Sequence, residues 1–414
     1  MNYLSKNIKS LRKSKKMTLK ELAEATNLSI GMLSLIENGK SSPSIESLNS
    51  ISKALNTDPI NLLGKVSKNE LREILQKLNN ITVNSNNDLE RIEELIEPIL
   101  PSLSKDYESA EILFKYSKEL YKLDNKNWQT YAIKAKEIYE SLHSYDNYCQ
   151  IELMFSREQM ISGHYSQAEQ IVNNIYNSFN NSSLITTKTL IDIHLQKIYI
   201  NISINNYEKA LEFLDQAIEI ALDKEQLSKI TVLYKVKIFL SASSFLYEDV
   251  HFYLNKLKEY VYFIQKDEYI CDYLFYKTHI HLFFIENPTI ALETINLLEK
   301  QLSNINEHQR EFYYKHCKMI KAVSYVLSER YDEAISLVTH HYTTKYIDEF
   351  ILPIEKCTFL LYSSYFAIGY AKKGELNKAL ELASYAVNEM KNFPQTVFHK
   401  KAEEILHSIK SHHH

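Results

Sequence analysis

The sequence from Leu11 to Leu63 reads LRKSKKMTLKELAEATNLSIGMLSLIENGKSSPSIESLNSISKALNTDPINLL. Side chains that can cap a helix stand before four of its apolar runs, at Thr18, Ser29, Ser44 and Asp58. Such side chains accept hydrogen bonds from the free backbone amides of a first helical turn. Glu21 follows Thr18 by three positions, which is the spacing of a capping box. With a first helix from about Tyr3 to Lys15, the pattern predicts five short helices in residues 1–65.

The composition of the whole chain predicts an all-α fold. The 414 residues include only 6 Gly and 7 Pro. Sheet-containing folds need such residues at most of their turns, so these numbers exclude them. A chain of this length also exceeds one compact core of ordinary size. We therefore expect several helical units or an extended repeat array.

The charge is distributed unevenly along the chain. Residues 1–65 hold ten Lys and Arg against five Asp and Glu, whereas the remainder holds 38 against 47. The N-terminal segment is thus basic and the body is acidic. Lysine and arginine side chains that neutralise phosphates release counterions and supply sequence-independent affinity. The asymmetry favours a nucleic-acid partner for the N-terminal segment.

The cysteines and the hydropathy pattern indicate a cytoplasmic protein. The four cysteines are far apart and form no CxxC pair, which is typical of reduced thiols: Cys149, Cys271, Cys317 and Cys357. No apolar run approaches the length of a membrane span, so we expect no membrane partner. No HExxH or GxSxG motif appears, and we predict no enzyme, cofactor or metal site. Residues 411–414, with three terminal histidines, look like the remnant of a purification tag.

Several linked features of residues 8–63 resemble the Cro/C1-type helix-turn-helix of the xenobiotic-response-element regulators, a lambda-repressor-like domain. They are the Arg12-Lys13 pair, the Thr18-x-x-Glu21-Leu22-Ala23 helix, and the helix from Ser29 to Asn38-Gly39-Lys40 with Pro43-Ser44 beyond it. In that fold the third helix lies in the major groove of DNA. The resemblance therefore implies binding of double-stranded DNA.

The resemblance also implies which residues contact DNA. Base edges would be faced by Ile30, Gly31 and Leu35, with Ser29, Met32 and Ser34 beside them. Leu19 occupies the position at the start of the second helix where the family has Gln. Phosphate contacts would come from Arg12, Lys20, Asn38, Lys40, Ser41 and Ser42. The residues that face the bases form few hydrogen bonds, so we expect specificity from thymine methyl groups, water and DNA shape.

Residues 66–100 are predicted to be a linker with one short helix, from Leu71 to Leu78. Beyond them, six times, an apolar or small residue follows a landmark residue by three positions: Tyr165/Ala168, Tyr207/Ala210, Tyr247/Val250, Pro288/Ala291, Tyr331/Ala334 and Leu376/Ala379. A further apolar or small residue comes four positions later: Val172, Leu214, Leu254, Ile295, Val338 and Ala383. The pattern resembles the second helix of tetratricopeptide (TPR) repeats. With a helical pair around Tyr116–Leu142 and a capping helix near Thr396–Ile409, residues 101–410 are predicted to form a right-handed solenoid with a concave groove.

Together the two parts resemble the peptide-responsive helix-turn-helix plus tetratricopeptide regulators of Gram-positive bacteria, the RRNPP family of PlcR-, NprR- and Rgg-like proteins. The resemblance implies a homodimer that binds a palindromic operator. It also implies that the repeats sense a short signalling peptide, as in quorum sensing, and alter dimer geometry and DNA binding.

The first helix of each repeat would line the groove. Counting back from the aromatic landmarks nominates ten peptide contacts: Gln150, Arg157, Asp192, Tyr199, Lys235, Phe239, Tyr273, Tyr276, His316 and Ser364. Amide and charged side chains would hold the peptide backbone, and aromatic ones would form side-chain pockets. Two alternatives stay open. The repeats would bind a protein such as a response regulator, or they would act as an oligomerisation scaffold with a groove filled by its own side chains.

Overall fold

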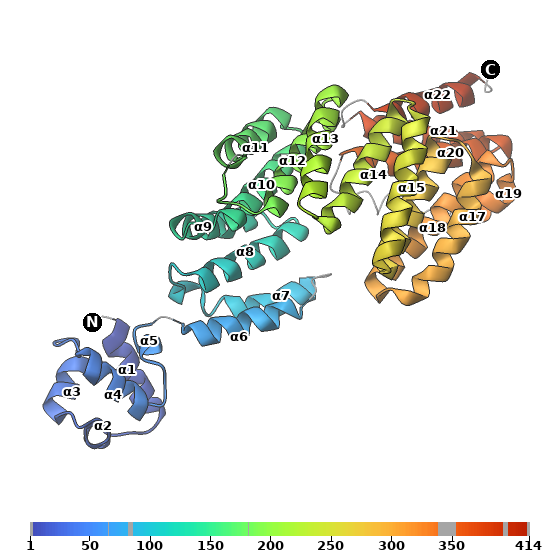
Figure 1. The fold of residues 1–414 in the computed structure, drawn as a ribbon. Coiled ribbons are helices and arrows are strands. Elements are labelled where there is room, and N and C mark those ends of the chain that lie inside the picture. The colour runs from blue at the N-terminus through green and yellow to red at the C-terminus, as the bar shows by residue number, and fades with distance from the viewer. Residues whose placement is uncertain are drawn as a thin grey trace. The chain divides into compact units, whose positions relative to one another are not determined.

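The computed structural model describes residues 3–64, 66–81, 86–180, 182–337, 353–391 and 396–411. Every regular element in these ranges is helical, which confirms the predicted all-α fold (Figure 1). The chain divides into two compact units, Met1–Ile151 and Glu152–His414. Helix α10 (Tyr145–Ile161) crosses the boundary between them. The tag-like His412, His413 and His414 lie outside the described residues, as does Val338 of the fifth repeat motif.

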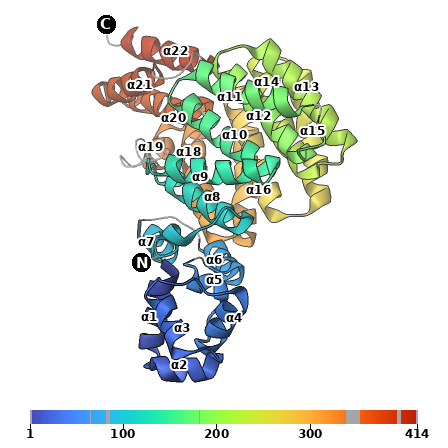
Figure 2. The ribbon, with the colours of Figure 1, turned by 90° about the vertical axis from the view of Figure 1, so that its left-hand side faces the viewer.

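The first unit begins with a bundle of five short helices, here called the head (Figure 2). They are α1 (Tyr3–Ser14), α2 (Leu19–Thr26), α3 (Ile30–Glu37), α4 (Ile45–Ala54) and α5 (Pro59–Leu62). Thr18 and Glu21 form the predicted capping box, because the Glu21 amide donates to Thr18 Oγ1 (3.2 Å) and the Thr18 amide donates to Glu21 Oε2 (2.6 Å). The other predicted caps also accept from the first turns of their helices: Ser29, Ser44 and Asp58.

One apolar core holds the head together. Its buried members come from all five helices: Ile8, Leu22, Ala23, Leu33, Ile36, Ile51, Leu55 and Leu62. After α3 the chain turns at Gly39, whose φ of 71° lies in the left-handed region that glycine adopts without strain. The turn ends α3 after two helical turns, so α3 is short and one of its faces is free of the core.

The segment predicted to be a linker with one short helix contains two helices. These are α6 (Lys68–Asn79) and α7 (Asn86–Ile96). Both pack on α8 (Tyr107–Lys122), which forms a hairpin with α9 (Trp128–Ser141). Arg72 of α6 donates from Nη2 to Glu108 of α8 at 2.8 Å, so the segment is bound to the helices that follow it. The domain limits at residues 65 and 100 stay a prediction.

The second unit is built from helical hairpins. Its helices are α11 (Tyr165–Phe179), α12 (Thr187–Ser203), α13 (Tyr207–Asp223), α14 (Leu227–Ser243), α15 (Tyr247–Ile264), α16 (Asp267–Phe283), α17 (Pro288–Gln301), α18 (Glu307–Leu327), α19 (Tyr331–Leu337), α20 (Pro353–Lys372), α21 (Leu376–Met390) and α22 (Val397–Ser411). Each of the six landmark residues is the first residue of an odd-numbered helix from α11 to α21. The predicted repeat phase is therefore confirmed.

The small residue of each motif explains how the hairpins pack. Ala168, Ala210, Ala291 and Ala379 are completely buried, because a methyl side chain lets two helices approach closely. The even-numbered helices bury residues on more than one face, as α12 and α14 show. Successive even-numbered helices from α12 to α20 also pack on one another, and α22 covers α20 and α21. The even-numbered helices thus form an inner layer.

The cysteine thiols lie in the interior, and the hydropathy of the helices bears on the expectation about membrane spans. All four cysteines are buried, and none of them is in a disulfide. Burial raises the pKa of the Cys271 thiol to about 11 and that of Cys317 to about 12. Within the described ranges, none of the helices has the length and apolar character that a membrane span requires.

Candidate DNA-binding surface and ligand cavity

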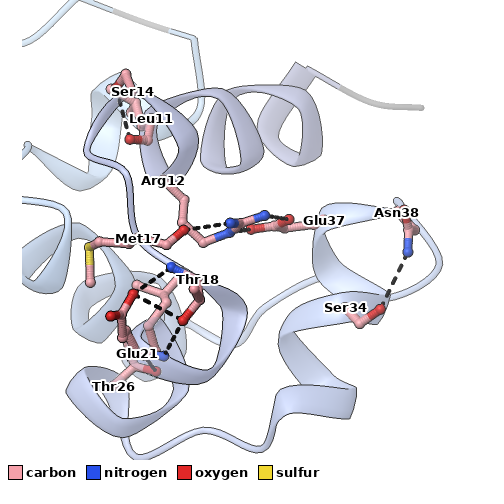
Figure 3. Close-up of polar contacts among 11 residues, drawn as sticks. Leu11, Arg12, Ser14, Met17, Thr18, Glu21, Thr26, Ser34, Glu37 and Asn38 are labelled. Carbon is pink, nitrogen blue, oxygen red and sulfur yellow. Dashed lines mark hydrogen bonds and ion pairs between the residues drawn. The ribbon is translucent and has the colours of Figure 1, made fainter.

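A buried ion pair fixes α3 in the head. Arg12 of α1 donates from Nε to Glu37 Oε1 (2.6 Å) and from Nη2 to Glu37 Oε2 (2.9 Å), and its Nη1 donates to the carbonyl oxygen of Met17 (2.7 Å). Figure 3 shows Arg12 between Glu37 and Met17. The residue thus ties α1 to the last residue of α3 and to the turn before α2. Hydrogen bonding to the Glu37 carboxylate raises the pKa of Arg12 above its ordinary value.

The same geometry places Arg12, for which the sequence suggests a phosphate contact, in the interior of the head. Only 8% of Arg12 is exposed and only 2% of Glu37. All three nitrogens of the guanidinium donate to groups inside the head, which is the arrangement of a structural residue. The Arg12-Lys13 motif that resembles the family therefore ties α1 to α3 through Arg12. The sequence gives no sign of this, because Glu37 stands 25 positions away.

The free face of α3 is apolar. Ile30 is 48% exposed, Met32 41% and Leu35 46%. Gly31 is exposed between them, and Ser29 caps the helix by accepting from the Met32 amide. Leu19 differs from the expectation, since it is half-buried and packs on the core of the head. Of the predicted base-facing residues, those of α3 itself are thus available to a partner.

Polar residues surround this face. Lys20, Asn38, Lys40 and Ser42 are exposed, whereas Ser34 and Ser41 are half-buried. Asn38 Nδ2 donates to Ser34 Oγ at 3.4 Å. Amines, amides and hydroxyls of this kind are the groups that contact phosphate oxygens. The described arrangement offers an apolar helix with cationic side chains nearby.

A second candidate site is a cavity of about 330 Å³ in the second unit. It is lined by the inner-layer helices α12, α14, α16, α18 and α20 and by Phe398 of α22. Ten of its eighteen lining residues are aromatic: Tyr199, Phe239, Phe275, Tyr276, Phe283, Phe284, Phe312, Tyr313, Phe359 and Phe398. Cavities of roughly 300 to 1,000 Å³ with mostly apolar walls are the usual form of ligand sites.

Few polar groups interrupt the aromatic wall. Lys235 Nζ contacts Asp272 Oδ2 at 2.5 Å, and both side chains are partly exposed. His279 Nδ1 lies 2.8 Å from the carbonyl oxygen of Phe275, and its Nε2 lies 2.7 Å from the Tyr362 hydroxyl. Burial lowers the pKa of His279 to about 4, so its ring is neutral at physiological pH. Nδ1 therefore donates to the carbonyl, and Nε2 accepts from Tyr362.

Four of the ten predicted peptide contacts line this cavity: Tyr199, Lys235, Phe239 and Tyr276. The other six do not. Gln150 belongs to the first unit, and Arg157 is half-buried on α10. The Asp192 carboxylate pairs with Lys229.

The last three of the six are buried in the packing of the repeats. Tyr273 is 5% exposed and its ring contacts that of Tyr262. His316 is 1% exposed and packs on the aromatic wall, with its ring centroid 4.4 Å from that of Phe312, and Ser364 is completely buried. Counting back from a landmark fails here because it does not fix the rotation of the inner helix: on α16, Tyr273 is buried and Tyr276 lines the cavity.

The cavity also contains residues that sequence reasoning missed. Phe275, His279 and Phe283 follow Asp272 on one face of α16 at helical spacing, and Phe312 and Phe359 face them from α18 and α20. A run of aromatic residues three or four apart on a first helix is the signal that could have found them. Phe398 belongs to the capping helix, and no repeat motif predicts its position. Within the described residues, no three His, Cys, Asp or Glu side chains are grouped as metal ligands.

The head thus has the helix-turn-helix fold, and the second unit is an array of helical hairpins whose landmark residues resemble those of tetratricopeptide repeats. Residues 8–62 match the sequence model of a helix-turn-helix family. A comparison with curated protein sequences gives no match.

Several solved structures are similar to this chain at low sequence identity. PlcR of Bacillus thuringiensis, in complex with the peptide PapR7 and DNA, is 16% identical with a TM-score of 0.32, covering 63% of this chain and 98% of PlcR. ComR of S. thermophilus, in complex with DNA and its signalling peptide ComS, is 18% identical with a TM-score of 0.28, covering 78% and 99%. A signal transduction ATPase with a tetratricopeptide repeat sensor, from Pyrococcus horikoshii, is 12% identical with a TM-score of 0.46, covering 100% and 69%. At these identities and TM-scores the likeness assigns no ligand and no residue role to this chain.

Proposed function

We propose that the chain is a transcription regulator that binds DNA through its head and senses a short peptide through its repeats. The observation that supports DNA binding is the free face of α3 within a segment that matches a helix-turn-helix family. An eight-residue helix presented in this way fits the major groove, where its N-terminal residues meet base edges. Such a regulator works in the cytoplasm of a bacterial cell.

The phosphate contacts are proposed to come from the side chains around α3. Lys20 precedes α3 in the sequence, and Asn38, Lys40 and Ser42 follow it. All four of these side chains are exposed. One small head makes few such contacts. We therefore propose that the protein binds as a homodimer to a palindromic operator, with half-sites one helical turn or a multiple apart.

The peptide site is proposed to be the aromatic cavity. Its wall can take up apolar or aromatic side chains of a ligand, while the ammonium of Lys235 and the carboxylate of Asp272 can meet a peptide's carboxylate and amine. At about 330 Å³ it accommodates a few side chains, with the rest of the peptide outside. The cavity also argues against the scaffold alternative, which expects a groove filled by the protein's own side chains.

Coupling between the ligand and the head is proposed to pass through the shape of the array. The cavity wall takes residues from five successive inner helices, whereas each hairpin packs mainly on its neighbours. A ligand that draws these helices together changes the curvature of the array. In a dimer this changes the spacing of the two heads, and half-site binding depends on that spacing.

Two selections with the full-length protein test the proposal. The first recovers DNA from a pool of random-sequence duplexes and then measures affinity at several salt concentrations by band shift. We expect enrichment of a palindrome, and we expect Lys40→Glu to lower affinity for all duplexes and to reduce the slope of log affinity against log salt by about 1. Recovery of no sequence, with no salt-dependent binding, would contradict a role in DNA binding.

The second selection exposes the protein to a synthetic pool of random heptapeptides and identifies bound peptides by mass spectrometry. We expect wild type to retain peptides rich in apolar residues and Tyr276→Ala to retain few. Arg157→Ala is the matched control, because Arg157 does not line the cavity. Equal retention by the Tyr276 variant would exclude the cavity as the peptide site.

Exposed aromatic residues on α15 support a second candidate, in which the repeats bind another protein. Phe252 is 53% exposed and Phe263 is 78% exposed, and they are eleven positions apart, so they lie on one face of the helix. A pull-down with and without peptide, using wild type and Phe263→Ser, tests this alternative. A protein captured by wild type but not by the variant would support it.

A further inference from the structure

The exposed side chains of α3 are apolar, and recognition of bases through hydrogen bonds to their edges does not explain such a surface. Ile30, Met32 and Leu35 expose between 41% and 48% of their surface on a helix of eight residues. Single exposed apolar residues are common on protein surfaces, but a group of them on one short element indicates a contact surface.

The polar groups of α3 are already engaged within the head. Glu37 is its only charged residue, and Arg12 holds that carboxylate in the interior. The Ser29 hydroxyl accepts from the Met32 amide. Asn38, directly after the helix, donates to the Ser34 hydroxyl. The helix contains no Arg, Lys, Gln or Asn, so it has none of the side chains that form bidentate hydrogen bonds with guanine or adenine.

Gly31 supplies an independent observation. A Cβ added at this position would meet no atom within 4 Å, so the packing of the head does not require glycine. Glycine inside a helix nevertheless destabilises it relative to alanine. The presence of glycine at position 31, where it lowers stability and the packing does not require it, is explained if a partner approaches the backbone there. The position lies between Ile30 and Met32, in the centre of the apolar face.

We propose that α3 recognises the C5-methyl groups of thymines in the major groove, and that the operator places thymines under Ile30, Met32 and Leu35. This inference rests on the proposed binding of DNA by the head. Among the four bases only thymine presents an apolar group to the major groove. Aliphatic and thioether side chains bury such a methyl group without leaving a polar atom unpaired. The absence of a side chain at Gly31 lets the helix come close enough for these contacts.

The test compares operators with and without the methyl groups. The duplex enriched by the full-length protein from the random pool is synthesised with thymine and again with uracil, which pairs identically but lacks the C5-methyl group. Burial of one methyl group contributes roughly a fourfold factor in affinity. Loss of two or three contacts therefore lowers affinity about 15- to 60-fold.

Variants of the head assign the effect to α3. Leu35→Ala lowers the affinity for the thymine duplex and reduces the ratio between the thymine and uracil duplexes by about fourfold. Leu63→Ala, which changes a residue that is 45% exposed and lies outside α3, keeps the wild-type ratio. A change in DNA flexibility caused by uracil would affect wild type and Leu35→Ala equally.

Three results would overturn the inference. Equal affinity for the thymine and uracil duplexes would exclude methyl recognition while leaving DNA binding intact. A preference for thymine that Leu35→Ala, Ile30→Ala and Met32→Ala all leave unchanged would exclude α3 as its source. Failure to enrich any duplex would overturn the proposed function itself, and the inference with it.

Discussion

Replacing Arg12 by leucine separates the structural role of this residue from a role in DNA contact. The substitution removes three hydrogen bonds and leaves the carboxylate of Glu37, which is 2% exposed, without its partner. Removing one member of a buried ion pair costs about 3 to 5 kcal/mol. A domain of about 60 residues has a total stability of roughly 3 to 9 kcal/mol. The variant therefore loses a third or more of the stability of the head.

Hydrogen exchange of the full-length protein, followed by mass spectrometry, measures this loss within the head. A destabilisation of about 3 kcal/mol accelerates exchange through opening by more than 100-fold. We expect this acceleration in peptides from α1 to α4 and unchanged exchange in the second unit. The neighbouring Lys13→Leu is the matched control, because Lys13 is exposed. The double variant Arg12→Met, Glu37→Leu should recover much of the protection, since an apolar pair replaces a buried ion pair at little cost.

The same variants distinguish the two roles of Arg12. If Arg12→Leu exchanges like wild type but binds DNA more weakly and with a smaller salt dependence, Arg12 contacts phosphate and its assignment to the ion pair is refuted. If the double variant is as unprotected as Arg12→Leu, the lost hydrogen bond to Met17 matters more than the unpaired, buried charge of Glu37.

Two further predictions follow from single residues. Gly31→Ala should stabilise the head by about 0.5 to 1 kcal/mol, because the added methyl group meets no atom, and it should weaken DNA binding. Urea unfolding measures the stability, and a band shift measures the affinity. Stabilisation without loss of affinity would show that nothing approaches Gly31. Burial, together with the charge of Lys197, lowers the pKa of His194 from 6.5 to about 4, so the folded protein keeps the ring neutral while the unfolded chain protonates it. The contribution of His194 to the stability of the second unit is therefore full above about pH 6.5 and falls as the pH drops toward 4. Urea unfolding of wild type and His194→Phe measures it: the variant should lose about 2 kcal/mol less of its free energy of unfolding between about pH 7 and pH 5. An unchanged pH dependence would assign that loss of stability to other groups.

The elements of the fold could be predicted from the sequence because their signals are local. Thr18 and Glu21 satisfy the amides of one turn, and a helix starts there whatever packs beside it. Each repeat landmark, such as Tyr207 with Ala210, marks a helix start and a close approach within a few residues. These features predict where helices begin. They also predict which small residues are buried.

The sites were predicted only in part because exposure depends on contacts between distant residues. Arg12 looks like a surface cation in the sequence, and only the fold brings it to Glu37. In the repeats, Tyr273 and Tyr276 are three positions apart on α16, yet only Tyr276 reaches the cavity. The rotation of each inner helix is set by the packing of its neighbours. A motif on the outer helix does not determine it.

The central claim is that a ligand in the aromatic cavity controls DNA binding by the head. The most direct measurement is the affinity of the full-length protein for its selected duplex, with and without a saturating amount of a peptide recovered from the heptapeptide pool. We expect the peptide to change the affinity of wild type by at least about tenfold, a coupling of roughly 1.4 kcal/mol. In Tyr276→Ala we expect no peptide effect and a peptide-free affinity within about threefold of wild type. An unchanged affinity of wild type in the presence of bound peptide, or a full peptide effect in Tyr276→Ala, would contradict the claim.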